Sequence, residues 1–262
     1  MRRRHWIELE DQTWFPASIR NCMTDLLNFF VTFFRVYDPI VPILYKAMMA
    51  SQSKKILDLC SGGSGAIRRM QNLLAQNYNY HIQVMLSDLY PNNNACARVN
   101  KLLDYTIVYL PESTDATQVP PYLNGFRTLF TSFHHFDPES ARKILANAVE
   151  NNKGIAIFEL SERSLKGTLG PIISTLLSFI ATPFIRPFCV KRLFLTYIIP
   201  IVPVAYLFDG IMSQLRSYTP EEMLMLAHEV CDGSYTWESG VAWHSFLPLR
   251  INYLVGYKSA AC

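Results

Sequence analysis

The chain has 262 residues, a length that suits one α/β domain with added segments. Half of the residues are hydrophobic and 17% are charged, against a usual charged share of about 25%, so the chain is apolar, with a mean hydropathy of +0.11. The net charge is only +3, and residues 2–4, three consecutive arginines, form the one dense basic run, which we interpret as a solvated end. The composition therefore argues against nucleic acid as a partner, because such proteins carry a basic patch or stripe.

The cysteines favour reduced thiols. They form no C-x-x-C motif and no Cys/His group at metal-binding intervals, so we expect neither a disulfide framework nor a metal site. We predict a cytoplasmic protein, with the inner face of a membrane as an alternative location. Acids at positions 8, 10 and 11 follow the basic start, so no secretory signal is expected. The six cysteines are Cys22, Cys60, Cys96, Cys189, Cys231 and Cys262.

Two helices are predicted before the first strand. Apolar residues recur at helical spacing over residues 18–37 and form a wide face. Asp38-Pro39 interrupts the pattern, and residues 40–50 are predicted to form a second, shorter helix.

Residues 54–65 combine a short apolar run with a glycine-rich turn. The run from Ile56 to Leu59 contains one acid, Asp58, and a helical pattern follows the turn over residues 66–77. In open α/β sheets, a strand, a glycine turn and a helix in succession bring the backbone close to a ligand. Glycine has no Cβ to block that approach, and the helix N-terminus offers free N–H groups to an anion. The turn lacks the G-x-G-x-x-G spacing of dinucleotide-binding folds.

Four further strands are predicted, each followed by polar residues. Because the carboxyl ends of parallel strands meet at one edge of a sheet, these residues predict a ligand site at that edge. The strands are 82–86 before Ser87-Asp88, 106–110 before Asp115-Ala116, 128–133 ending at His134-His135, and 154–158 before Glu159. Helices are expected between them at 91–103 and at 138–150, the latter capped by Asp137.

In this order, the features resemble the class I S-adenosylmethionine-dependent methyltransferases, over about residues 54–163 with a further match at 235–258. Residues 58–65 are similar to that family's D-x-G-x-G-x-G loop, although Cys60 stands at the first glycine and Ser64 at the third. The resemblance implies an α/β fold with a Rossmann-like seven-stranded sheet and helices on both faces. It also implies S-adenosylmethionine as the cofactor.

The resemblance assigns roles to the residues of the loop and of the next two strands. The N–H groups of the loop would bind the cofactor carboxylate, and Asp58 its ammonium group. Asp88 would hold the ribose hydroxyls, and Asp115-Ala116 would contact the adenine edge. We interpret Cys60 as a small filler rather than a nucleophile. The cofactor-binding candidates are Asp58, Cys60, Gly62, Gly63, Gly65, Asp88, Leu89, Asp115, Ala116 and Ser132.

Residues 132–136 are similar to the fourth-strand segment of the small-molecule branch, as in quinone-biosynthesis C-methyltransferases. An O or C acceptor must lose a proton, and His134, His135 and Glu159 are the candidate bases. Alignment without a base is the alternative. We predict a methyltransferase for a small apolar or lipid-like acceptor. The alternatives are a non-catalytic, membrane-associated protein of the same fold and another use of the fold, such as a nicotinamide-dependent reductase or an aminopropyl transferase.

The segment 165–216 is an unusually apolar insert. Its two uncharged runs, 169–185 and 193–208, are each 16–17 residues long, short of the ~20 that a membrane-spanning helix needs. Arg186, Lys191 and Arg192 separate the runs. The insert could be an internal roof over the substrate, an interfacial hairpin whose three cations meet anionic head groups, or two spanning helices. As a roof or hairpin it favours an apolar acceptor.

The C-terminal part is predicted to complete the sheet. Thr219-Pro220 begins a helix that extends to about residue 230, and strands at 235–241 and 251–257 form an antiparallel hairpin. We divide the chain into a helical cap (1–53), a cofactor-binding core (54–164), the insert (165–216) and a C-terminal helix and hairpin (217–262). The cap would cover the site or pack against the sheet edge, and both can hold. The oligomeric state is left open.

Overall fold

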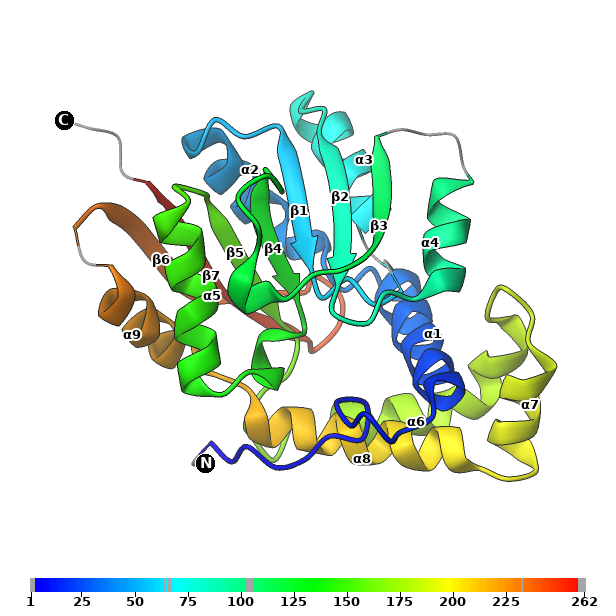
Figure 1. The fold of residues 1–262 in the computed structure, drawn as a ribbon. Coiled ribbons are helices and arrows are strands. Elements are labelled where there is room, and N and C mark those ends of the chain that lie inside the picture. Colours follow the sequence, from blue (N-terminus) through cyan, green and yellow to red (C-terminus); the bar gives the residue numbers. More distant parts are fainter. Residues whose placement is uncertain (1–2, 64, 66, 102–105, 232, 259–262) are drawn as a thin grey trace.

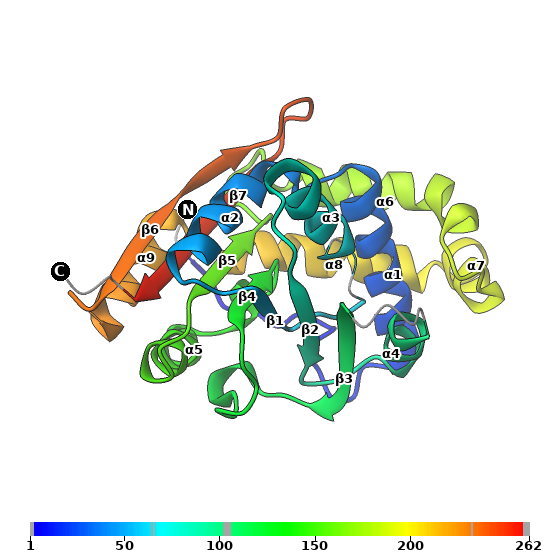
Figure 2. The ribbon, with the colours of Figure 1, turned by 90° about the horizontal axis from the view of Figure 1, so that it is seen from above.

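The computed structural model describes residues 3–63, 65, 67–101, 106–231 and 233–258. Its centre is a seven-stranded sheet with the order β3-β2-β1-β4-β5-β7-β6 (Figures 1 and 2). The first five strands are parallel, and β7 is antiparallel to both β5 and β6. The strands are β1 (Lys55–Leu59), β2 (Gln83–Asp88), β3 (Ile107–Ser113), β4 (Phe126–Phe130), β5 (Ile155–Glu159), β6 (Tyr235–Trp243) and β7 (Arg250–Lys258).

Helices cover both faces of the sheet, as predicted. One core cluster joins one face to α2 (Val41–Ala50), α3 (Ile67–Tyr78) and α4 (Asn93–Asn100). A second cluster joins the other face to α5 (Pro138–Glu150) and α9 (Pro220–Val230). The architecture is therefore the three-layered α/β fold that the sequence predicts.

The helix caps follow their local sequence signals. The Asp137 carboxylate accepts from the Ser140 N–H at 2.7 Å, and Pro138 fills the first helical position of α5. At α9, Thr219 and Glu222 cap each other's backbone N–H groups. Both helices begin and end where the sequence predicts. The helix predicted over 91–103 is shorter, since α4 begins at Asn93 and ends at Asn100. The expectations for Ser64, for a helix start at 66 and for Cys262 lie outside the described residues.

The predicted fourth strand, 128–133, is wrong at both ends. The strand begins at Phe126 and ends at Phe130, because Thr131 adopts a left-handed backbone conformation with φ 46°. The short 3-10 helix η3 (Phe133–His135) then carries both histidines. His134 and His135 therefore lie on a turn beyond the strand, at the same edge of the sheet.

The two N-terminal helices pack in different places. The first, α1 (Ala17–Phe33), stops four residues before the predicted end, and Arg35 turns the chain with φ 54°. The second, α2, packs into the sheet's core cluster. α1 packs mainly against the insert, reaches the same cluster through Val31, and also lies over the glycine turn. The position of α1 agrees with a cap over the site, whereas α2 packs on a face of the sheet and not at its edge.

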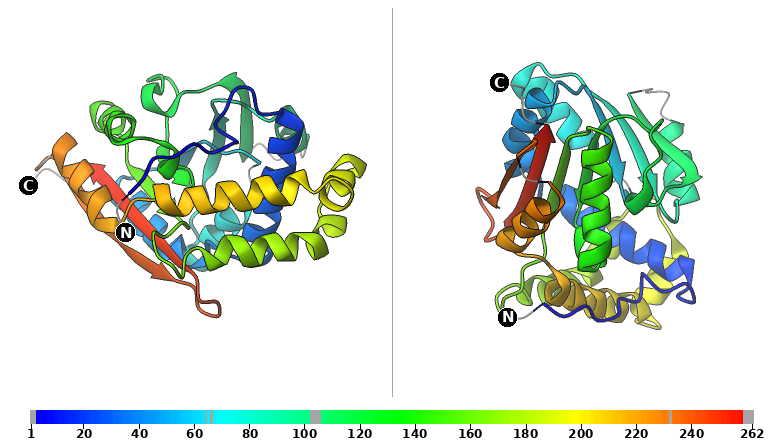
Figure 3. Two further views of the ribbon diagram at one scale, coloured as in Figure 1. Left: turned by 90° about the horizontal axis from the view of Figure 1, so that it is seen from below. Right: turned by 60° about the vertical axis from the view of Figure 1, so that its left-hand side comes forward.

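The insert forms three helices rather than a two-helix hairpin. They are α6 (Leu169–Ala181), α7 (Val190–Tyr197) and α8 (Ile201–Arg216). α6 and α8 pack beside each other below the carboxyl edge of the sheet, and α7 lies at their far end (Figures 1 and 3). A third core cluster holds their inner side against α1 and the N-terminal segment.

The expectation that Arg192 faces head groups is wrong. This side chain is only 1% exposed, and its Nη1 lies 2.6 Å from the Asp25 carboxylate on α1. Arg186 and Lys191 are exposed, as expected. The basic segment is therefore split between an internal ion pair and two surface cations.

Within the described ranges, no single helix combines the length and apolarity needed to cross a membrane. Two bent helix pairs pass that test together: α1 with residues 38–50, bent by 66°, and α7 with α8, bent by 77°.

Candidate active site

The glycine turn begins with a residue under backbone strain. Cys60 directly follows β1 and has φ 58°, in the left-handed region that favours glycine. Gly62 has φ 51°. Cys60 thus adopts the conformation expected of the glycine that it replaces in the D-x-G-x-G-x-G loop. Burial raises the pKa of its thiol well above the usual value, so the group is neutral, in keeping with a filler role.

Asp88 fixes the shape of this turn from the end of β2. Its Oδ2 accepts the Gly62 N–H at 2.8 Å, and its Oδ1 accepts the Tyr90 N–H at 2.8 Å. The Tyr109 hydroxyl donates to the Gly62 carbonyl at 2.9 Å. Each carboxylate oxygen has a second lone pair, so Asp88 retains acceptor capacity for a ligand.

Asp58 is a buried acid with only neutral groups hydrogen-bonded to its oxygens. The Ser61 hydroxyl donates to Oδ2 and the Thr128 hydroxyl to Oδ1, each at 2.6 Å. Burial raises the pKa of this carboxyl to about 7, because an ionised group is costly away from water. A cation placed beside Asp58 would favour its ionised form.

The remaining cofactor candidates lie nearby. Asp115 caps the short helix η2 (Ala116–Gln118), and its Oδ1 accepts from the Thr117 N–H at 2.8 Å. The Thr114 N–H donates to the Asp88 carbonyl at 2.8 Å and links this loop to β2. Ala116 and Ser132 are buried, while Leu89 is exposed. The structure therefore brings all of these residues to one edge of the sheet.

Helix α1 lies directly over the glycine turn, through residues that the sequence analysis did not identify. The Gly65 N–H donates to Asn28 Oδ1 at 3.2 Å, and the Thr32 hydroxyl donates to the Gly65 carbonyl at 3.2 Å. A Cβ at Gly63 would lie 1.7 Å from Asn28 Nδ2, so any other residue there would displace the Asn28 side chain. The available signal was a polar stripe, Thr24, Asn28 and Thr32, at four-residue spacing on an otherwise apolar helix.

Glu159, at the end of β5, organises the candidate bases. Its Oε1 accepts the Phe133 N–H at 2.6 Å, and its Oε2 lies 2.7 Å from His134 Nδ1. We assign the imidazole N–H to Nδ1, which then donates to Glu159 Oε2. His134 Nε2 then faces the Glu8 carboxylate at 3.9 Å. His134 and Glu159 are both buried.

His135 is held by acids of the N-terminal segment. Its Nδ1 lies 2.8 Å from both Glu8 Oε2 and Asp11 Oδ1, and its Nε2 lies 3.6 Å from Glu10. Burial opposes the charged imidazolium, but the carboxylates of Glu8 and Asp11 outweigh it and raise the pKa of His135 well above its usual value. His135 is therefore a cation in an ion-pair network.

Residues 8–11, which we call the strap, are bound between the insert and η3. On α8, Asp209 accepts the N–H groups of Leu9 and Glu10 at 2.7 and 3.0 Å. Arg216 Nη1 lies 2.7 Å from Asp11, and Arg216 donates to the His135 carbonyl at 2.6 Å. The strap therefore covers both histidines, and His134 is only 2% exposed.

The same cluster contains atoms of metal-ligand type. One ligand atom each from Glu8, His134 and His135 lies within 4.8 Å of the others. Arg216 Nη1 lies 3.4 Å from Glu8 Oε2, so a guanidinium and an imidazolium already face the Glu8 carboxylate. We interpret the cluster as an ion-pair network. The sequence analysis missed Glu8, Asp11, Asp209 and Arg216, although three acids within four residues of an apolar chain were a signal.

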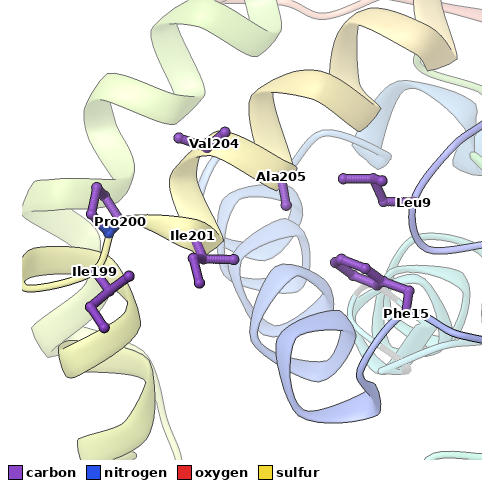
Figure 4. Close-up of a pocket in the computed structure, with 7 residues that line it drawn as sticks. All are labelled: Leu9, Phe15, Ile199, Pro200, Ile201, Val204 and Ala205. Atoms are coloured by element: carbon purple, nitrogen blue, oxygen red, sulfur yellow. The ribbon is translucent and has the colours of Figure 1, made fainter.

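An apolar cavity of about 300 Å³ lies beside the strap (Figure 4). Leu9 forms one wall, next to Glu8, and Phe15 lies beside it. The opposite wall is the start of α8 with Ile199, Pro200, Ile201, Val204 and Ala205. A second cavity, of about 350 Å³, lies at the amino ends of β1, β4 and β5, far from the candidate site.

No family model and no curated protein matches the chain. Solved structures match it in fold. The plantazolicin methyltransferase BpumL, in complex with a triazolic desmethylPZN analog and SAH, has a TM-score of 0.53 and 11% identity, over 92% of this chain and 99% of that chain. Its counterpart BamL, with the same kinds of ligand, has a TM-score of 0.51 and 14% identity, over 92% and 98%. PigF with SAH has a TM-score of 0.50 and 18% identity, over 95% and 63%. At such identities the likeness concerns the architecture, and the chain has the fold of the class I S-adenosylmethionine-dependent methyltransferases.

Proposed function

We propose that the chain is an S-adenosylmethionine-dependent methyltransferase acting on a small apolar or lipid-like acceptor. The observation that carries this proposal is the arrangement of Asp58, the glycine turn and Asp88 at one edge of the sheet. It offers a buried acid, a glycine turn ahead of a helix N-terminus and a second acid in series. BpumL, BamL and PigF, which share this fold, are bound to SAH.

The residues present fit the cofactor. Burial makes the ionised form of Asp58 costly, and a neighbouring cation would offset that cost, so this carboxylate suits the ammonium group of the cofactor. The turn suits the carboxylate, Asp88 the ribose hydroxyls, and Asp115 with Ala116 the adenine edge. The cofactor supplies an activated methyl group for displacement in line with the acceptor. The protein's part is to bind, orient and exclude water.

The pair of His134 and Glu159 is the proposed general base. Glu159 fixes the proton on Nδ1 and leaves the Nε2 lone pair to accept a proton from the acceptor. Glu8 now faces Nε2, so the strap must shift before an acceptor can contact His134. Alignment without a base remains the alternative mechanism.

The surroundings of the strap support the proposal of an apolar acceptor. The cavity at Leu9 and Phe15 is lined by apolar side chains and adjoins the residue that covers His134. An isoprenoid or acyl chain would fit such a lining, because it gains from leaving water. A lipid-like acceptor would come from a membrane, and the insert is the part of the chain that would meet it.

Calorimetry with S-adenosylmethionine, S-adenosylhomocysteine and NADH tests the cofactor assignment. We expect the first two to bind. Asp88→Ala should weaken their binding at least tenfold, since hydrogen bonds to a charged group contribute about 1.5–3 kcal/mol each. Glu112→Ala, at an exposed acid of β3, is the matched control and should bind normally. Because Asp88 also holds Gly62, each variant's unfolding midpoint is measured alongside.

Three outcomes would contradict the proposal. Unchanged affinity in a folded Asp88→Ala variant would remove the ribose assignment. NADH binding in place of S-adenosylmethionine would favour a reductase. Cofactor binding without turnover on any phenolic or isoprenoid acceptor would favour the non-catalytic alternative.

A further inference from the structure

The insert has an exposed apolar surface that extends over its three helices. We call the side chains that form it the outer surface of the insert. They are Leu169, Ile172, Ile173, Leu176, Phe179 and Ile180 on α6, Phe184 and Phe188 before α7, Val190, Phe194, Tyr197, Ile198 and Ile199 on and after α7, and Ile201, Val204 and Phe208 on α8. Scattered exposed hydrophobic residues are ordinary, but contiguous apolar patches beyond a few hundred Å² are uncommon on soluble monomers.

Helix α6 exposes its apolar side and buries its small and polar side, the reverse of an ordinary surface helix. Its exposed apolar residues recur at intervals of three and four and form one stripe, with Leu176 and Ile180 65% and 69% exposed. Its buried residues are small or polar and include Thr175 and Ser178. Ser178 donates to the backbone of its own helix. The apolar side of α6 therefore faces away from the protein core.

The charges on this surface all have one sign. Residues 163–208 contain no Asp or Glu. The exposed charged residues of that stretch are Lys166, Arg186 and Lys191, whereas Arg192 is buried against Asp25. A second copy of the chain would bring like charges together across a symmetric contact. An anionic lipid surface complements both the cations and the apolar side chains.

We propose that the outer surface of the insert docks on an anionic lipid bilayer, with α6 and α8 lying against it and Arg186 and Lys191 at the head groups. Figure 3 shows both helices on the lower side of the molecule, with the N-terminal segment alongside α8. In this orientation the apolar cavity at Leu9 and Ile201 lies beside the lipid. This inference rests on the proposed function, since it gives a lipid-like acceptor a route to the site.

Flotation with phosphatidylcholine vesicles, with and without phosphatidylglycerol, tests the docking. We expect the parent chain to float with the anionic vesicles and to bind neutral ones less. Arg186→Gln with Lys191→Gln should weaken anionic binding about 30-fold, from about 1 kcal/mol per charge. Leu176→Gln with Ile180→Gln should abolish flotation with both vesicle types.

Matched controls lie away from the surface. Lys54→Gln with Lys55→Gln removes two exposed cations near the amino edge of the sheet, and Tyr122→Gln removes a side chain that is 81% exposed. Both should float like the parent. A parent chain that ignores both vesicle types overturns the docking. Self-association that rises with concentration, occurs without vesicle binding and disappears in the Leu176 and Ile180 variant would also overturn the docking. It would show that a second copy of the chain covers this surface. S-adenosylmethionine binding is measured in each preparation, so failure of the docking is distinguished from failure of the proposed function.

Discussion

The glycine turn and the strap meet the same edge of the sheet, but they are assembled in different ways. The turn draws on residues 58–65 and Asp88, which two neighbouring strands bring together. The strap cluster draws on residues 8–11, on η3, on Glu159 and on Arg216 at the end of α8. The first region follows from the strand order alone, whereas the second depends on where the insert and the N-terminal segment pack. Local motifs can reveal a cofactor site in the sequence, but the cover of an acceptor site depends on distant contacts.

The largest expected effect tests whether the residues beneath the strap include the general base. His134→Gln and Glu159→Gln should each lower turnover by about 10²–10⁴-fold, because they remove a proton acceptor or its orienting partner. Cofactor affinity should stay within about threefold, since both residues lie outside the glycine turn. Turnover is measured as release of S-adenosylhomocysteine, with a phenolic or isoprenoid acceptor that the parent chain methylates. His81→Gln, at an exposed histidine, is the control. Full turnover in both variants would leave alignment as the mechanism.

A smaller effect tests whether the strap is fixed by charge. Glu8→Gln keeps the shape but turns an amide toward the His135 imidazolium and Arg216. Breaking a buried ion pair costs about 3–5 kcal/mol, and Asp11 still faces both cations, so we expect a loss of about 2–3 kcal/mol in the free energy of unfolding. Urea denaturation measures this loss.

Glu112→Gln is the matched control for the strap, and its unfolding should be unchanged. A Glu8→Gln variant as stable as the parent would show that the strap is held by Asp209 and the backbone. Limited proteolysis near residues 8–11 would then show whether the strap has opened without global unfolding.

The third prediction is a pH dependence on the glycine-turn side. The pKa of Asp58 is about 7 in the folded chain, above its ordinary value of 3.8, so ionising it costs stability above pH 7 and that cost fades as the pH falls toward 4. Binding an ammonium requires the ionised form. Affinity for S-adenosylmethionine should therefore fall about tenfold per pH unit below pH 7. Calorimetry between pH 5.5 and 8 measures the slope.

The Asp58→Asn variant shows whether the pH dependence comes from Asp58 or from another titrating group. The amide cannot ionise, so the variant should bind weakly at pH 8 and show a flat profile below pH 7. The same slope in Asp58→Asn and in the parent would assign the dependence to another group and remove the ammonium role from Asp58.

The sequence predicted correctly the features that depend on a few neighbouring residues. The caps of α5 and α9, the acids after β1 and β2, and the antiparallel hairpin depend on neighbouring residues or on strand order. Its errors concern contacts between distant segments. The predicted fourth strand ends three residues too late because nothing in the neighbouring sequence marks Thr131 as left-handed. Arg192 was assigned to the surface because Asp25, its partner, lies 167 residues away in the sequence.

The smallest expected effect tests whether the left-handed backbone conformation of Cys60 strains the glycine turn. Cys60 has φ 58°, where a residue with a Cβ pays about 1–2 kcal/mol that glycine does not. Cys60→Ala loses the thiol and keeps the strain, whereas Cys60→Gly loses both. Glycine also gains freedom in the unfolded chain, which offsets about 0.4–1 kcal/mol. We therefore expect the glycine variant to exceed the alanine variant by about 0.5–1 kcal/mol in the free energy of unfolding, measured by urea denaturation without cofactor. An alanine variant as stable as the glycine variant would mean that the turn relaxes away from the left-handed conformation, and that Cys60 is tolerated because the loop yields there.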